Sequence, residues 1–244
     1  MRLLPIIFTF CFGILPAQAL EIPTSLTQSE LDDVARILGF NTSTKFLSNP
    51  YPLGGYTGLE VGISHEIINI EELSLLGAQT SPQSEFRYNR ISVGKGLFNN
   101  FDAFIHFVPY SESNQVSEYG TLLKWSFYEA SYLPFSVSSI FHLNTINIED
   151  SYVNQSVGGD LMFGVNVNRF ALYFGGGYVR SRSQFTSSIL DGSVSTSSDN
   201  TYKETFTSSH SFVGVHFDIM KMFLAGQIDK YEDPVYSVKL GYRL

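Results

Sequence analysis

Cysteine is nearly absent from this sequence of 244 residues, because Cys11 is the only one. A single cysteine cannot form an intramolecular disulfide, so the fold must rest on its own hydrogen bonding and burial. Charged residues make up only 16% of the chain, and 15 basic residues stand against 23 acidic ones. This balance argues against nucleic acid as a partner.

Long apolar runs are also missing, with one exception near the start of the chain. Arg2 precedes an apolar stretch over residues 3–15, and residues 17–19 (Ala-Gln-Ala) form a small-x-small cleavage site. This arrangement predicts a secretory signal peptide over residues 1–19. Prolines and a glycine interrupt the stretch, which is shorter than the roughly 20 residues of a spanning helix, so a membrane anchor is the weaker interpretation. Cys11 lies within the apolar stretch and not at the cleavage point, which argues against lipidation.

Residues 20–55 predict a short helix followed by a linker. Thr27 and Glu30 have the spacing of a capping box, and Gly39 is a typical helix stop. Leu31, Val34 and Leu38 would form one apolar stripe of an amphipathic helix, which must rest on another surface. The proline- and glycine-rich segment 41–55 predicts an extended linker.

The whole sequence contains 21 phenylalanines, 14 tyrosines and 20 glycines, most of them within residues 56–244, and this composition is typical of a β protein. Most of the alternating segments in this part of the chain are ten to sixteen residues long, enough to cross a bilayer at a tilt. We predict ten strands, at 56–67, 86–97, 101–110, 116–127, 135–147, 152–165, 169–182, 202–217, 222–231 and 234–244.

The connections between these segments differ in length. Short connections occur around residues 99–100, 128–134, 166–168 and 218–221, whereas 68–85 and 183–201 are long and polar. Transmembrane barrels have short inner turns and longer outer loops. If the first strand starts on the inner side, all these short turns lie inside, both long connections lie outside, and both termini lie inside. The segment 183–201 could instead be a linker between two domains.

The last nine residues alternate apolar and polar side chains without exception. The apolar row is Tyr236, Val238, Leu240, Tyr242 and Leu244. Together with the signal sequence and the strand rhythm, this row resembles the closing strand of bacterial outer-membrane β-barrel proteins, the porin-like superfamily. The resemblance implies a Gram-negative cell envelope, contact with outer-membrane lipid and lipopolysaccharide, and recognition of the row as an insertion signal by the barrel-assembly machinery. It also implies that Leu244 replaces the usual terminal Phe.

The predicted fold class is therefore all-β, a ten-stranded antiparallel transmembrane β-barrel with a short N-terminal amphipathic helix at its inner mouth or inside it. A soluble all-β sandwich is the competing interpretation. Aromatic residues should form girdles at the two lipid interfaces. Candidates for the inner girdle are Trp125, Phe127, Phe135, Phe170, Phe223 and Tyr242, and those for the outer girdle are Tyr88, Tyr119, Tyr178 and Tyr236.

Alternation directs a second, polar set of side chains into the lumen. These lumen-lining candidates are Glu60, Arg90, Glu118, Lys124, His142, Asp160, His210, Lys239 and Arg243. A charged group in a narrow barrel needs a partner, because an isolated buried charge costs several kcal/mol or more. We therefore expect acids paired with bases, with Glu60 as one candidate partner of Lys239 and Arg243.

These side chains leave three hypotheses for function. The leading one is a narrow pore or passive uptake protein for small solutes, in a monomer. The alternative is a plugged barrel with a structural or surface-binding role through its outer loops, and the third is an outer-membrane hydrolase. His210 and His216 lie too far apart along a strand to act as a pair, and no motif for a metal or another cofactor occurs. The sequence thus predicts a protein that is not an enzyme.

Overall fold

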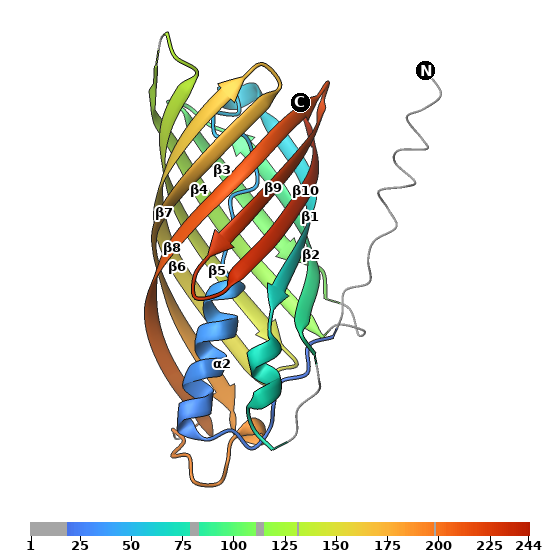
Figure 1. The fold of residues 1–244 in the computed structure, drawn as a ribbon, viewed down its shortest axis with the longest axis vertical. Helices are drawn as coiled ribbons and strands as arrows, with labels where there is room; N and C mark the ends of the chain where they lie inside the picture. Colours follow the sequence, from blue (N-terminus) through green and yellow to red (C-terminus); the bar gives the residue numbers. More distant parts are fainter. Residues whose placement is uncertain (1–18, 79–82, 111–114, 131, 198) are drawn as a thin grey trace, which may run out of the picture.

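The computed structural model describes residues 19–78, 83–110, 115–130, 132–197 and 199–244. Nearly all of the predicted signal peptide, residues 1–18, lies outside these ranges. Ten antiparallel strands form one closed barrel in these parts of the chain (Figure 1). This confirms the ten-stranded antiparallel barrel, and the soluble sandwich is wrong.

Each strand is hydrogen-bonded to its sequence neighbours, and β1 pairs with β10 to close the wall. The strands are β1 (Leu59–Asn69), β2 (Glu85–Gly96), β3 (Phe101–Val108), β4 (Val116–Glu129), β5 (Phe135–Ile148), β6 (Tyr152–Val167), β7 (Phe170–Thr186), β8 (Thr201–Ile219), β9 (Met222–Lys230) and β10 (Pro234–Arg243). In the closing pair, Glu60 lies opposite Arg243 and Ile68 lies opposite Val235. Closure of this kind leaves no free edge along the paired parts of the wall.

The two ends of the barrel differ. At the short-turn end, the connections are 97–100, 130–134, 168–169 and 220–221. Asn99 and Asn100 have φ values of 59° and 61°, as a tight hairpin turn requires. The other end, which we call the long-loop end, carries the connections 70–84 and 187–200, containing the 3-10 helices η2 (Glu71–Leu75) and η3 (Ser187–Ile189). The segment 183–201 is thus one hairpin of the barrel and not a linker between domains.

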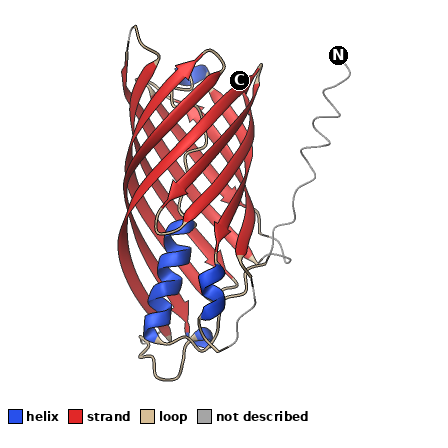
Figure 2. Cartoon of the chain, in the orientation of Figure 1, coloured by secondary structure: helices blue, strands red, loops and turns tan. Residues whose placement is uncertain are grey.

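The N-terminal segment runs through the barrel from one end to the other. Helix α2 (Gln28–Asn41) lies inside the wall at the long-loop end, against β6, β7 and β8 (Figure 2). Residues 42–53 continue through the lumen, and η1 (Gly55–Thr57) lies at the short-turn end, where β1 begins. The start of β1 and the end of β10 lie at one end of the barrel, as an even number of strands requires, whereas the described residues that precede α2 lie at the opposite end.

Side chains on the two faces of the wall change character part of the way along the strands. On the outward face of β5, Phe141 and Leu143 lie nearer the short-turn end, and Thr145 and Asn147 lie nearer the long-loop end. The inward face shows the reverse, since the buried His142 and Asn144 give way to the buried Ile146 and Ile148. We call these regions the apolar-wall half and the polar-wall half, after their outward faces.

Other strands follow the same division. Phe170, Leu172 and Phe174 face outward on β7 in the apolar-wall half, and Arg180 and Arg182 face outward farther along. Two aromatic residues depart from the predicted girdles. Tyr88 and Phe223 are fully buried inside the barrel, because they fall on the inward parity of β2 and β9.

Among the described residues, no helix has both the length and the apolar character needed to cross a membrane.

Candidate functional site

The most distinctive site is the lumen, which is occupied by residues 28–53, and we call these residues the plug (Figure 1). The residues just before the plug contact the long loops. The Leu26 N–H donates to the carbonyl of Ile189 (3.0 Å), and the Asp191 N–H donates to the carbonyl of Leu26 (2.9 Å). The Ala78 N–H donates to the carbonyl of Thr24 (3.0 Å). Residues 24–26 are therefore held between both long connections before the helix begins.

The start of α2 is fixed by Glu30. Its carboxylate accepts hydrogen bonds from the Thr27 N–H (2.8 Å), the Thr27 hydroxyl (2.7 Å) and the Gly77 N–H (3.0 Å). These donors, the Gly77 N–H above all, hold the pKa of the Glu30 carboxyl below its usual value because they favour the ionised form. The predicted capping box thus also ties the helix to the loop that follows β1.

Helix α2 packs into an apolar lining. Leu31, Val34 and Leu38 are fully buried among inward side chains of the polar-wall half. The wall residues of this cluster include Ile68, Phe86, Val108, Val116, Ile146, Ile148, Val179, Phe185 and Val235. A helix satisfies most of its own backbone hydrogen bonds, so the surrounding wall can be apolar.

Gly39 allows the helix to approach the wall closely. A Cβ at this position would lie 2.4 Å from the Ser181 hydroxyl oxygen and 3.3 Å from Asn154 Oδ1. The Asn154 amide donates to the Gly39 carbonyl at 3.0 Å. The residue that the sequence suggests as a helix stop is therefore also a contact point between the plug and β6 and β7.

Beyond the helix, the extended segment 42–53 depends on the wall for its hydrogen bonds. Lys124 donates to the carbonyls of Asn49 (3.0 Å), Pro50 (3.4 Å) and Tyr51 (2.6 Å). The same ammonium group lies 3.0 Å from Asp102. Buried backbone outside helices and sheets must find other hydrogen-bond partners within the protein, and this fully buried lysine supplies them to the least regular part of the plug.

Other wall groups complete the support. The Asn144 amide donates to the Thr42 carbonyl (2.8 Å), and the Tyr173 hydroxyl donates to the Phe46 carbonyl (3.2 Å). Asp102 accepts from the Leu53 N–H at 3.1 Å. The helix therefore packs against an apolar part of the wall, whereas the extended segment needs polar side chains that bond its backbone. The inward residues of the barrel supply both.

The charged groups of the lumen are paired. Glu60 binds Lys239 and Arg243, each at 2.7 Å, and accepts a hydrogen bond from the Ser48 hydroxyl of the plug (2.6 Å). This arrangement brings together the partners that we suggested for the closing strand. Removing the Glu60 carboxylate from water costs free energy, and its attraction to two cations offsets this cost.

A second network joins the plug to four strands, β1 to β4. Arg90 bridges Glu66 and Glu118, each at 2.5 Å, and Lys45 of the plug lies 3.1 Å from Glu66. His106 lies 3.5 Å from Glu118. Removal of the plug would thus leave the contacts of Arg90 with its two acids intact.

Histidine and aspartate side chains form a third network across β5, β6, β8 and β9. His142 lies 3.3 Å from Asp160, and His210 lies 3.0 Å from Asp160 and 2.9 Å from Asp229. A histidine between two carboxylates could take part in proton transfer. All four side chains are at most 3% exposed, so a substrate has no access to them in this structure.

Small residues make room for these side chains. A Cβ on Gly120 would lie 2.1 Å from the His106 ring, and one on Gly158 would lie 2.3 Å from the His142 ring. Glycines on the inward face thus let large polar side chains of a neighbouring strand lie along the wall. The lumen consequently has space for both its side chains and the plug.

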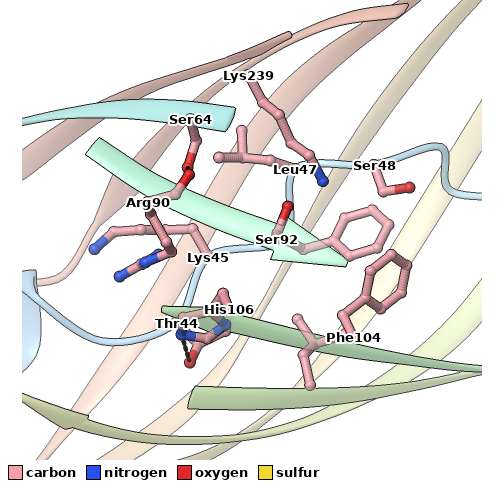
Figure 3. A pocket seen from close by; sticks show the side chains of 12 residues that line it. Thr44, Lys45, Leu47, Ser48, Ser64, Arg90, Ser92, Phe104, His106 and Lys239 are labelled. Atoms are coloured by element: carbon pink, nitrogen blue, oxygen red, sulfur yellow. Dashed lines mark hydrogen bonds between the residues drawn. The ribbon is translucent and has the colours of Figure 1, made fainter. Parts of the chain in front are cut away.

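Little free space remains beside the plug. A cavity of about 30 Å³ lies between Lys45 and Phe46 on the plug and Arg90, His106 and Lys239 on the wall (Figure 3). Such a volume holds one or two water molecules. In this conformation the described residues leave no cavity here that is large enough for a solute.

All nine predicted lumen residues lie on the inward face, and all are buried except Arg243, whose side chain is 22% exposed. The predicted insertion row of β10 faces outward. Sequence reasoning missed Lys45, Glu66 and Asp102. The inward parity of β1 identifies Glu66 and that of β3 identifies Asp102, whereas Lys45 lies in the extended segment and had no such pattern. The parts of the chain that the structure describes contain no cluster of His, Cys, Asp and Glu suited to a metal ion.

No model of a protein family and no curated protein matches this sequence. Similar solved structures include the N-terminal β-barrel domain of Pseudomonas aeruginosa OprF, at 10% identity over 78% of this chain and 99% of that chain, with a TM-score of 0.38. The KdgM porin in complex with disordered oligogalacturonate matches at 10% identity over 75% and 98%, with a TM-score of 0.39. Ail of Yersinia pestis matches at 15% identity over 77% and 97%, with a TM-score of 0.31.

The protein's own architecture defines its class. Its wall is closed, and the apolar-wall half exposes large apolar side chains around the barrel, among them Ile105, Leu123, Phe141, Leu161, Phe174, Val215, Leu224 and Val238. In a closed barrel every strand can pair its backbone N–H and C=O groups with neighbouring strands, as lipid requires. The outward side chains of a barrel in lipid are apolar. The described residues therefore form a closed ten-stranded antiparallel β-barrel, and its outward apolar band is of the kind that a membrane-embedded barrel needs.

Proposed function

We propose that this protein is a plugged outer-membrane barrel that is closed to solutes and acts through the surface formed at its long-loop end. One observation carries the proposal: residues 42–53 fill the lumen, with their backbone bonded to wall side chains such as Lys124 and Asn144. The remaining cavity of about 30 Å³ is too small for a nutrient. This favours the plugged barrel over the open pore that we ranked first from sequence.

In this proposal the long-loop end faces outward, as it does in barrels with short inner turns. The functional surface then consists of residues 20–27 together with the described parts of the two long connections. Backbone bonds join Thr24 to the first of these connections and Leu26 to the second. Its role is structural support or binding of a surface partner. The protein is not an enzyme in this proposal, because the His210 network is buried.

Epitope insertion tests the orientation. A tag placed directly before Leu20 should bind antibody on intact cells, whereas a tag after Leu244 should bind only after the outer membrane is permeabilised. Labelling of the C-terminal tag alone on intact cells would refute the proposed orientation. The two positions form a matched pair because they lie at opposite ends of one barrel.

A gated pore is the second candidate. It is favoured by the pairing of Arg90 with Glu66 and Glu118, and of Glu60 with Lys239, because these wall pairs do not need the plug. If the plug moved, a lumen with paired charges would remain for a small solute.

Recording of single channels separates the two candidates. The mature chain lacks cysteine, so Gly39→Cys with Ser181→Cys introduces one possible disulfide between plug and wall, at a site where a Cβ would lie 2.4 Å from the Ser181 oxygen. We expect no current steps from the wild type in planar bilayers. Steps that occur in the reduced double variant and disappear on oxidation would establish the gated pore instead. A variant lacking residues 20–50 shows whether the wall alone can conduct, provided that its heat-modifiable gel mobility shows a folded barrel.

A further inference from the structure

The outward face of the polar-wall half carries a cationic depression of about 730 Å³ over β5 to β8. Arg180 and Arg182 of β7 and Lys203 of β8 supply its three charges, and all three side chains are exposed. We call these three residues the outer cationic patch. It lies on the outside of the barrel and is separate from the plugged lumen.

Strand register brings the three cations together. Arg180 and Arg182 are two residues apart, so they share the outward face of β7 at a spacing of about 6 to 7 Å. Arg182 lies directly opposite Thr205, and Lys203 is the next outward residue of β8. Diagonal neighbours of this kind are within reach of long side chains. The three charges can therefore converge on one anionic group.

No acidic side chain offsets this charge on the same surface. Among the described residues, the outward positions of β5 to β8 around the depression, at 143–147, 153–157, 178–184 and 203–209, include no Asp or Glu. Arg87, which faces outward on β2, provides the contrast because it forms an ion pair with Glu85 on the same strand. The cations of the outer cationic patch can therefore bind an external anion, whereas Arg87 is already paired with Glu85.

The position of the patch indicates what kind of anion it meets. The next outward residue from Arg180 toward the short-turn end is Tyr178, which is 69% exposed, and Phe174 follows within the apolar band. Leu143 and Val157 line the depression beside the cations. Aromatic side chains favour the boundary between lipid and water, so the patch lies at headgroup level with apolar surface directly next to it.

We propose that the outer cationic patch binds the phosphate groups of a phosphorylated outer-leaflet lipid, while Leu143 and Val157 contact the start of its acyl chains. Arginine matches phosphate oxygens with paired donors, and lysine adds a point charge. A free phosphate could use the cations but not the apolar surface. The inference rests on the outward orientation of the long-loop end, and not on whether the lumen conducts.

Lipid binding tests the proposal on the full mature protein in detergent micelles, with diphosphoryl lipid A as the probe and native mass spectrometry as the readout. The triple variant R180Q/R182Q/K203Q should bind about tenfold more weakly, since each exposed charge pair contributes a factor of about two to three. R87Q is the matched control and should bind as the wild type does. Monophosphoryl lipid A should bind more weakly than the diphosphoryl form, and added salt should weaken both.

Several results would overturn the inference. Equal binding by the wild type and the triple variant would exclude the patch, and an equal loss in R87Q would show that total charge alone matters. Full competition by inorganic phosphate at millimolar concentration would identify a free-anion site and not a lipid site. Heat-modifiable gel mobility verifies that every variant is folded. The channel recordings are independent of these outcomes, so failure of the closed-barrel proposal is distinguishable from failure of this one.

Discussion

The two halves of this barrel are built on opposite rules. In the apolar-wall half, Phe141 faces outward and His142 faces inward, as in a membrane barrel with a polar lumen. In the polar-wall half, Thr145 faces outward and Ile146 faces inward, as in a soluble β protein with an apolar core. One continuous strand, β5, contains both arrangements.

The difference follows from what each face of the wall must contact. Outside, lipid requires apolar side chains and water accepts polar ones. Inside, α2 bonds its own backbone and can pack against apolar residues, whereas the extended segment 42–53 needs donors such as Lys124. The surroundings of the outer face and the part of the plug that lies inside both change near the same level of the barrel. The apolar residues of a strand therefore move from its outward face to its inward face at that level.

The largest expected effect comes from the polar support of the plug. Lys124→Met removes a fully buried ammonium group, leaving Asp102 without its cation and three plug carbonyls without their donor. Breaking a buried pair on one side typically costs about 3 to 5 kcal/mol. We expect a loss of this size in the free energy of unfolding, measured by urea titration in lipid vesicles.

Lys203→Met is the control for this substitution, because it removes the same charge from an exposed position of the outer wall. Its effect should stay within about 0.5 kcal/mol. If both variants lost equal stability, Lys124 would not be the support that the geometry indicates.

The outward faces give the second comparison. Phe141→Arg places a charge in the apolar band and should reduce the free energy of unfolding by about 2 to 4 kcal/mol. Asn147→Arg makes the matched change six residues farther along β5, beyond the band, and should cost about 0 to 1 kcal/mol. Both are measured in vesicles of one lipid. Equal losses would show that the boundary between the two halves lies elsewhere.

Much of the wall could be predicted from sequence because each strand carries its own alternation. The predicted segment 135–147 agrees with β5 (Phe135–Ile148) to one residue at its end. The exchange of faces is also present in the sequence, since the apolar residues of β5 change from odd to even positions between Leu143 and Ile146. A single alternating pattern for the whole strand predicts one apolar face and therefore does not reveal this change.

The plug could be predicted only in part. Capping and an apolar stripe indicated a helix that needed a surface to pack against, and α2 is present. Residues 41–55 indicated an extended chain, but no local pattern shows that such a chain lies inside a barrel. Its position depends on donors from distant strands, such as Lys124 and Tyr173, which only the fold brings together.

A third prediction concerns the helical half of the plug. Gly39→Ala places a methyl group 2.4 Å from the Ser181 oxygen, and overpacking of this kind costs about 1 to 3 kcal/mol. Alanine in a helix recovers roughly 0.5 to 1 kcal/mol relative to glycine. We expect a net loss of stability in the wild-type background and a smaller loss or a gain in Ser181→Ala, which removes the contacting oxygen. A double-mutant cycle from urea unfolding measures this coupling, and strict additivity would contradict the close contact.

The smallest expected effect lies at the start of α2, where the plug meets the long loops. The folded-state pKa of Glu30 is lowered from 4.5, so its stabilising contribution is fully present above that pH and is lost as the pH falls through the lowered value. Because the Glu30 side chain is partly exposed to solvent, screening keeps the effect below about 1 kcal/mol. Hydrogen exchange of the Leu31 amide, which bonds to the Thr27 carbonyl, should therefore accelerate as the pH falls below 4.5, after correction for intrinsic exchange. Glu30→Gln should remove this pH dependence, whereas Asp33→Asn, an exposed acid of the same helix, should retain it. Loss of the dependence in both variants would attribute it to the general charge of the helix start and not to the bonds between Glu30, Thr27 and Gly77.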